Sequence, residues 1–121
     1  MEPSSIIVGI NISKAHLNVA LHPFEGERVL PNTTTSIATL VTDLEAIHPR
    51  MIALESTGGD EWPVVRALLK TMLPVIVVSP SRVRDFAVAT GLLSQEALFA
   101  MTGAIDAHML ARFASTPRAA A

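Results

Sequence analysis

The chain has no cysteine among its 121 residues. This absence excludes disulfides, thiolate metal sites and a cysteine nucleophile, and it suits a reducing compartment. The amino terminus carries no basic cluster, and the longest apolar runs are far shorter than the roughly 18 residues that a membrane span needs. We therefore expect a cytoplasmic protein with no membrane partner.

Aromatic residues are also scarce, with one Trp, four Phe and no Tyr. The core must then be built from Val, Ile, Leu, Ala and Met, a composition that suits a well-covered α/β sheet. The mean hydropathy of +0.43 is high for a small domain. Such a value points to apolar surface that a partner or further sequence covers.

A strong excess of basic charge is missing as well, because the formal net charge is −2. Binding of nucleic acid through counterion release alone is therefore not indicated. The charges are uneven: residues 1–61 hold three basic and eight acidic side chains, whereas residues 62–121 hold six basic and three acidic ones, a balance of +3. Any contact with nucleic acid must rest on local geometry.

The order of apolar patterns predicts a three-stranded meander followed by strand–helix units. Residues 6–12 form an Ile- and Val-rich run typical of a strand buried on both faces, and residues 17–22 alternate as a half-buried strand does. A short third strand at 28–30 is stopped by Pro31. Apolar residues at helical spacing then predict a helix up to His48, with an N-cap among residues 32–36.

Two further buried strands are predicted at 51–54 and 75–78. Each is followed by a predicted helix, and this alternation of strands and helices implies parallel pairing. Between them Asp60 is the expected cap of a helix that carries Pro63 in its first turn. The residues expected to face inward from this helix are Trp62, Val65, Leu69 and Met72. Later helices are predicted over 82–90 and about 104–114. A single domain over residues 1–114 with a frayed tail at 115–121 follows from this pattern.

Polar residues stand at the ends of these elements. Asn11 ends the first strand, Glu55 ends the fourth, and Asp106 lies at the last helix. A meander followed by two strand–helix units is the order of the ribonuclease H-like fold, which brings acids together at one end of a mixed sheet of about five strands with helices on both faces. Such acids hold two divalent cations ~3.5–4 Å apart for phosphodiester chemistry, and hard oxygen ligands suit Mg²⁺.

Four separated motifs carry a family resemblance. Val8–Lys14 matches V-G-I-D-x-S-K except at Asn11, and Glu55–Gly59 matches E-A-T-G-G except at Ser56. Val78–Gly91 closely matches V-N-P-x-x-V-R-D-F-A-x-A-T-G, with Ser79 in place of Asn, and Met101–Ala111 aligns with K-T-D-x-x-D-A-x-x-L-A. The chain resembles, over almost its whole length, the amino-terminal (DEDD, RuvC-like) domain of the insertion-sequence 110 family of transposases. The resemblance implies DNA transposition and site-specific DNA recombination under an RNA guide.

Departures from the family pattern concern the acids themselves. Asn11 stands in place of the first acid, Gly103 in place of the third and Met101 in place of the Lys, and the stretch from 91 to 103 is longer than in the family. The family continues into a coiled coil and a second domain with a serine nucleophile, which is absent from these 121 residues. The resemblance therefore implies a truncated transposase domain with impaired catalysis, and it leaves open whether the chain is an enzyme.

The predicted site residues follow from this resemblance. Glu55 and Asp106 would hold a weakly bound Mg²⁺ with Asn11 as a neutral ligand, while Gly103 is a degenerate catalytic position. Glu96 is a weak substitute for the third acid. The predicted nucleic-acid contacts are Lys14, Thr57, Gly58, Arg82 and Arg84. The implied partners are DNA, a guide RNA, and a second copy of the chain or a full-length transposase.

Alternative interpretations remain at this point. The domain would act as a regulator if it only docked DNA, RNA or an intact transposase without cleaving. A sugar-kinase or actin-like half-domain also opens with a Gly-Ile-Asp strand, but it needs a second phosphate loop that the sequence lacks. In the plainest interpretation Asn11 is a strand-end polar residue, Glu55 a solvated or capping acid, Asp106 a surface acid, and the arginines are only solvated.

Overall fold

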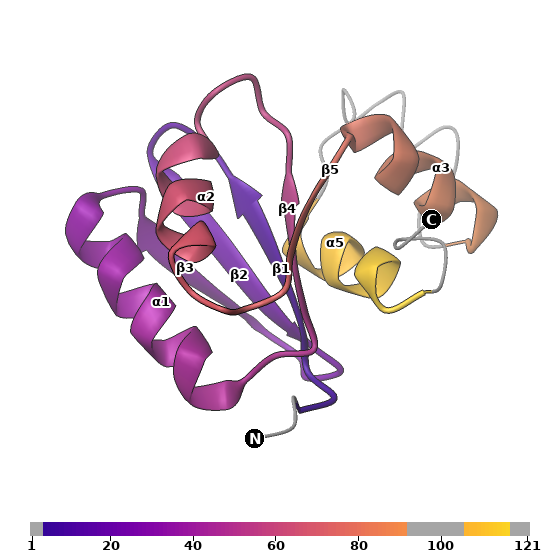
Figure 1. Cartoon of the computed structure of the whole chain (residues 1–121). Helices are drawn as coiled ribbons and strands as arrows, with labels where there is room; N and C mark the ends of the chain where they lie inside the picture. The colour runs from indigo at the N-terminus through magenta and orange to yellow at the C-terminus, as the bar shows by residue number, and fades with distance from the viewer. Residues whose placement is uncertain (1–3, 92–105, 117–121) are drawn as a thin grey trace.

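The computed structural model describes residues 4–91 and 106–116 (Figure 1). These residues form a five-stranded mixed sheet flanked by helices. The α/β class, the mixed sheet and its expected strand number are therefore confirmed. Gly103, Glu96 and Met101 lie outside the described residues.

The sheet has the strand order β3-β2-β1-β4-β5. Its strands are β1 (Ile7–Ile12), β2 (His16–His22), β3 (Glu27–Pro31), β4 (Met51–Glu55) and β5 (Val75–Val78). The first three pair antiparallel, whereas β1 with β4 and β4 with β5 pair parallel. The meander and the parallel pairing predicted from the sequence are both confirmed.

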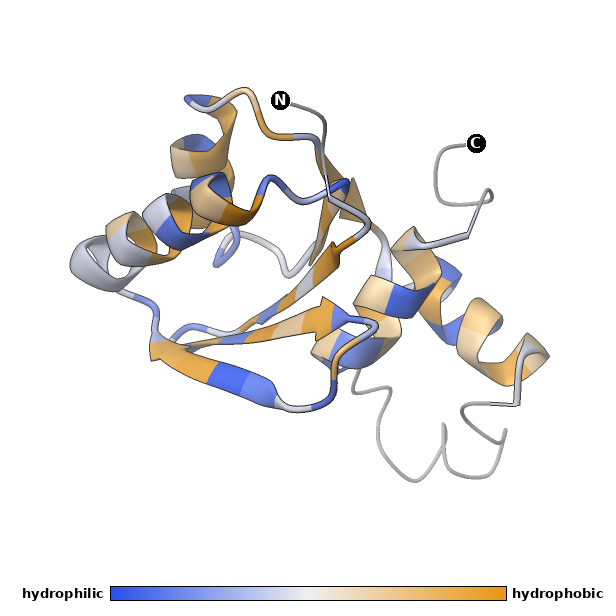
Figure 2. Cartoon of the chain, turned by 90° about the horizontal axis from the view of Figure 1, so that it is seen from below, coloured by the Kyte–Doolittle hydropathy of each residue, from blue (hydrophilic) through white to orange (hydrophobic). Residues whose placement is uncertain are grey.

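Helices cover the two faces of the sheet (Figure 1). On one face lie α1 (Thr34–Ile47) and α2 (Trp62–Leu69), and on the other lies α5 (Ala107–Ala114) with α3 (Pro80–Ala89) beside it. The apolar stretches of the strands run between these two layers (Figure 2). None of the helices within residues 4–91 and 106–116 is long and apolar enough to cross a membrane.

Large aliphatic side chains fill the space between the sheet and the α1/α2 layer. They come from alternate positions of the strands and from the inner stripes of both helices, as the predicted periodicities require. The buried members are Val8, Ile10, Ile12, Leu17, Val19, Ile37, Leu40, Leu44, Ile52, Leu54, Val64, Val65 and Leu68.

Small residues form the contact on the opposite face. Ile7 and Ala53 of the sheet pack with Ala111 and Ala114 of α5. A Cβ built on Gly9 would lie 2.1 Å from the carbonyl oxygen of Ala107. Only glycine permits this approach of backbone to backbone.

Capping residues and proline explain where the helices begin, and two of these positions differ from the predicted ones. Thr33 caps α1 by accepting a hydrogen bond from the Ser36 amide, as one of the expected caps. Helix α3 begins at Pro80 instead of residue 82, because proline suits the first turn of a helix. Helix α5 begins at Ala107, later than residue 104, because Asp106 caps it.

The inward face predicted for α2 was wrong at three of its four positions. Trp62, Leu69 and Met72 are 53%, 69% and 100% exposed, and Val65 alone of the predicted set is buried. The helix turns Val64, Val65 and Leu68 inward, and Met72 lies beyond its end at Leu69. Asp60 is not the cap, because the helix starts after Glu61, whose side chain makes no capping bond.

Candidate functional site

The carboxyl ends of the parallel strands β1 and β4 meet at one edge of the sheet. Ile10 pairs with Leu54 in the parallel register, so Asn11 and Glu55 are the next residues along their two strands. Alternation places both side chains on the face that α5 covers, together with Gly9 and Ala53. Both residues are partly buried. The structure thus brings Asn11 and Glu55 side by side.

Asp106 enters this face from α5. Its carboxylate accepts a hydrogen bond from the Met109 amide at 2.8 Å and so caps the helix. The first residue of α5, Ala107, lies over Gly9, while Ala111 and Ala114 pack with Ile7. Helix α5 therefore points its N-terminus toward the Asn11 end of β1, and Asp106 lies there with an exposed side chain.

Asn18 is a polar neighbour that the sequence interpretation did not select. It pairs with Asn11 across β1 and β2, and cross-strand partners share a face of the sheet. Its side-chain amide also approaches Glu27 Oε2 at 3.5 Å. The signal was present, because the alternation of residues 17–22 already placed Asn18 opposite the buried Leu17 and Val19.

The carboxyl group of Glu55 has an altered acidity. Partial burial raises its pKa above the usual glutamate value, and the positive charge of Arg84 opposes that rise. Arg84 belongs to α3, which packs beside α5. Of the predicted phosphate contacts, Arg84 therefore acts directly on the electrostatics of the candidate site.

Arg82 and Lys14 are placed differently. The Arg82 guanidinium carbon lies 5.3 Å from the ring centroid of Phe113, which in turn contacts Phe86 edge-on with centroids 5.6 Å apart. Arg82 thus borders a groove of about 290 Å³ between α3 and α5. Lys14 is exposed in the turn between β1 and β2, just beyond Asn11.

The loop after Glu55 is folded around a buried carboxylate that the sequence interpretation missed. Glu61 is 5% exposed, and its Oε1 accepts hydrogen bonds from the Thr57 hydroxyl and the Gly59 amide, both at 2.8 Å. Burial alone would raise the pKa of Glu61, but its hydrogen bonds with backbone amides and the Thr57 hydroxyl lower the pKa overall. Gly58 and Gly59 have φ of 85° and 142°, conformations that favour glycine.

A second hydrogen-bonded link joins this loop to the turn after β1. The side-chain amide nitrogen of Asn32 donates to the Ser13 carbonyl at 3.0 Å and to the Asp60 carbonyl at 3.3 Å. Asn32 follows β3 and precedes α1. One side chain therefore ties together the loops that continue from Asn11 and from Glu55.

A divalent cation such as Mg²⁺ requires several oxygen ligands. The described parts of the chain contain no group of three or more His, Cys, Asp or Glu side chains that could hold a metal. The oxygens of Glu55, Asp106 and the Asn11 amide are hard donors of the type that Mg²⁺ prefers. Two carboxylates would be too few to balance the charge of two divalent ions.

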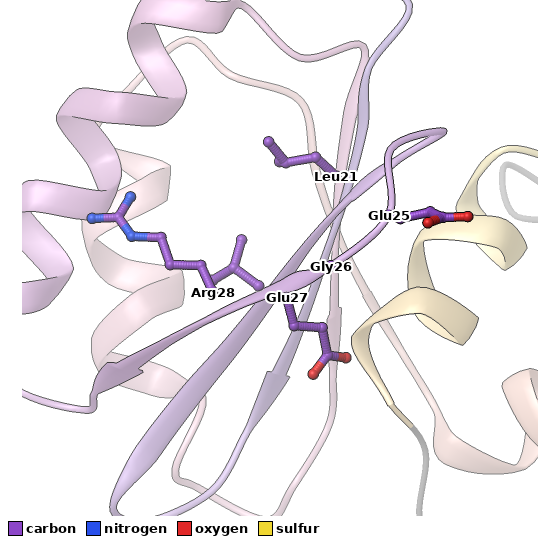
Figure 3. Close-up of a pocket in the computed structure, with 6 residues that line it drawn as sticks. Leu21, Glu25, Gly26, Glu27 and Arg28 are labelled. Carbon is purple, nitrogen blue, oxygen red and sulfur yellow. The ribbon is translucent and has the colours of Figure 1, made fainter.

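Another pocket lies at the β2–β3 hairpin (Figure 3). It has a volume of about 270 Å³ and is lined by Val19, Leu21, Glu25, Gly26, Glu27 and Arg28. The charged side chains of Glu25 and Arg28 point to different sides of the ribbon (Figure 3), and Arg28 forms an ion pair with Asp43 at 2.6 Å. The pocket therefore lacks convergent polar groups, and the edge near Asn11 and Glu55 is the stronger candidate.

No family model matches this chain, and no curated protein matches it significantly. The motif resemblance to transposases therefore stays a prediction. The positions of the polar residues on the sheet carry the functional argument.

Proposed function

We propose that this chain is a ribonuclease H-like, nucleic-acid-binding domain, similar to the RuvC-like amino-terminal domain of the insertion-sequence 110 transposases, with impaired catalysis. The observation that carries the proposal is the placement of Asn11 and Glu55 on adjacent parallel strands, on the face where Asp106 caps α5.

The topology supports the finer fold assignment. A ribonuclease H-like sheet begins with an antiparallel meander and adds its fourth and fifth strands parallel to the first, beyond it. The order β3-β2-β1-β4-β5 agrees with that description. The helix that follows the sheet in sequence, α5, crosses the face next to β1 and β4, where such folds hold their last acid.

The residues at this edge divide the work of binding a phosphodiester. Glu55 and Asp106 supply carboxylate oxygens and Asn11 an amide oxygen for Mg²⁺, which when bound polarises a phosphate and offsets its charge. The positive charge of Arg84, which acts on Glu55, would attract the same phosphate. From the turn after β1, Lys14 contacts the phosphate backbone of the nucleic acid.

Binding without efficient cleavage is the activity that this edge favours. Asn11 adds no negative charge where the family pattern has an acid, and burial disfavours the charged form of Glu55. Both effects weaken the hold on a cation. The partner would be branched or nicked DNA, a structured RNA, or an intact transposase whose assembly the domain regulates.

The test compares variants for binding to a four-way DNA junction and for cleavage of it, in Mg²⁺ and in Mn²⁺. We expect salt-dependent binding with little cleavage, and weaker divalent-dependent binding in Glu55→Ala. Glu45→Ala is the matched control, because Glu45 is an exposed acid on α1, away from this edge.

Asn11→Asp provides the gain-of-function arm of the test. Restoring the carboxylate should tighten Mg²⁺ binding by about tenfold, since affinity for hard cations follows the charge of the ligands. Mg²⁺ binding unchanged in both Asn11→Asp and Glu55→Ala would contradict the proposed cation site. Failure of the wild-type chain to bind any junction or structured RNA would contradict the proposed function.

A further inference from the structure

We propose that Glu61 is a positioning residue that fixes the 56–60 loop beside Glu55, so that the polar edge of the sheet keeps one geometry. The loop begins at the residue after Glu55, and the Ser56 amide donates to the Val78 carbonyl at 3.0 Å, which continues the β4–β5 ladder. The chain then turns away from the sheet through Gly58 and Gly59 to reach α2. The importance of this geometry for binding rests on the proposed function.

A single oxygen atom fastens the turn. Glu61 Oε1 receives the Thr57 hydroxyl and the Gly59 amide at 2.8 Å each, from residues on either side of Gly58. Glu61 is 5% exposed. A buried carboxylate costs free energy unless donors converge on it, and here the loop itself supplies the donors.

The same contacts bear on the phosphate site predicted at this loop, whose backbone amides were expected to face a phosphate. The Gly59 amide donates to Glu61 instead. The Thr57 hydroxyl is also turned inward onto Glu61. The loop is therefore held in one conformation next to Glu55. The Thr57 hydroxyl and the Gly59 amide already donate hydrogen bonds to Glu61.

Asn32 connects this loop to the loop after β1. Its side-chain amide holds the Asp60 carbonyl, next to Glu61, and the Ser13 carbonyl, two residues after Asn11. The spacing between the loop after β1 and the loop after β4 is thus set by Asn32 and Glu61 together. The loops that follow two different strands depend on these hydrogen bonds for their relative position.

The experiment compares Glu61→Leu, which removes the acceptor, with Glu61→Gln, which keeps the Oε1 acceptor for Thr57 and Gly59. Glu45→Leu makes the same chemical change on the exposed face of α1 and serves as the control. Three readouts are taken from each full-length variant: amide hydrogen exchange at Gly59, the NMR resonances of the Asn11 side-chain amide and Glu55 backbone amide, and affinity for the DNA junction.

In Glu61→Leu we expect Gly59 to exchange at least about tenfold faster, while the amides of β1 and β4 stay protected, because only the loop opens. The Asn11 and Glu55 resonances should move, and junction affinity should fall about tenfold through misplacement of the binding groups. Glu61→Gln keeps both hydrogen bonds, so the Asn11 and Glu55 resonances and the junction affinity should stay close to the wild type. Gly59 should exchange faster than in the wild type but more slowly than in Glu61→Leu, because the acceptor is no longer charged. Glu45→Leu should show no change.

Faster exchange at Gly59 with unmoved Asn11 and Glu55 resonances would overturn the proposal, because Glu61 would then stabilise only its own loop. If the wild type binds no nucleic acid, the proposed function fails, and the resonances still decide the positioning role. If Glu61→Leu does not fold, Thr57→Val removes one hydrogen bond without changing the side-chain shape. The same resonances should then move by a smaller amount, and their constancy would overturn the proposal.

Discussion

The two faces of the sheet are packed with side chains of different size. Toward α1 and α2, residues such as Ile10, Leu54 and Leu68 separate the layers by full aliphatic side chains. Toward α5, Gly9 and Ala111 let backbone approach backbone. The first contact buries much apolar surface, which favours the folded state. The second fixes where the N-terminus of α5 lies relative to the ends of β1 and β4.

This difference explains why the candidate site lies on the small-residue face. The distance of a helix from the sheet depends on the size of the side chains between them. A helix held by backbone contact at Gly9 has little room to shift, so Asp106 is carried to one place. The face toward α1 and α2 therefore contributes most of the stability, whereas the face toward α5 fixes the position of that helix.

The largest expected effect comes from adding one methyl group to the close contact. Gly9→Ala should lower the free energy of unfolding by about 4 kcal/mol or more, because a Cβ would lie 2.1 Å from the Ala107 carbonyl oxygen. Gly26→Ala is the control, since Gly26 has open space around it and a φ of 91°, so only about 1–2 kcal/mol of backbone strain is expected. Urea unfolding measures both. Equal losses would show that α5 tolerates a wider separation from the sheet.

The next effect tests the opposite face by removing volume. Leu54→Ala should cost about 2–4 kcal/mol, because Leu54 is fully buried in the aliphatic cluster and its truncation leaves a cavity. Leu69→Ala on the exposed side of α2 should change stability by less than about 0.5 kcal/mol. A loss at Leu54 as small as at Leu69 would contradict the stabilising role given to this face.

A smaller effect is expected at the carboxylate that precedes α2. Glu61→Gln should lower stability by about 2 kcal/mol at neutral pH, because hydrogen bonds to a charged acceptor are replaced by neutral ones. The folded pKa of Glu61 is lowered, so its contribution is present above the ordinary glutamate pKa and is lost as the pH falls through the lowered value. Urea unfolding from pH 7 to pH 3 should show the difference between wild type and variant shrinking on acidification. A constant difference would rule out a role for the charge.

The smallest effect is expected at Glu55, on the α5 face, with the opposite sign. Its folded pKa is raised, so the native state binds the proton more readily, and stability falls as the pH rises through that raised value. Glu55→Gln should therefore be at least as stable as the wild type at pH 7, with the advantage fading toward pH 4. The same pH series checks this, and a clear loss of stability at pH 7 would show that the Arg84 interaction outweighs burial.

Periodicity explains how much of the fold the sequence could predict. The strands β1, β4 and β5 and the helix α1 carry unbroken apolar patterns, and all were found within a few residues. The expected burial of β5 was wrong, because β5 lies at the edge of the sheet and only Val78 of its four residues is buried. The phase of α2 was misjudged because Trp62, Leu69 and Met72 are apolar yet exposed, so apolar character alone pointed to the wrong face. Exposed hydrophobic residues are common on folded proteins, which makes short helices ambiguous.

The candidate site was predictable where it depends on strand register and unpredictable where it depends on loop conformation. Parallel strands end at a common edge, which is why Asn11 and Glu55 could be placed together in advance. Nothing in the pattern around Gly58 indicates that Glu61 turns back into the loop, since charged residues before a helix are usually solvated. Asn32 was considered only as a cap, and its long-range hydrogen bonds depend on tertiary structure.

The close contact between Gly9 and α5 has an evolutionary corollary. A copy of this sequence that keeps every polar residue of the edge but gains a side chain there would separate α5 from the sheet and carry Asp106 away with it. Such a copy would keep its acids and yet lose the placement of Asp106 at the edge of the sheet. In sequences related to this chain, a glycine at position 9 is therefore as informative about the geometry of this edge as the acids are.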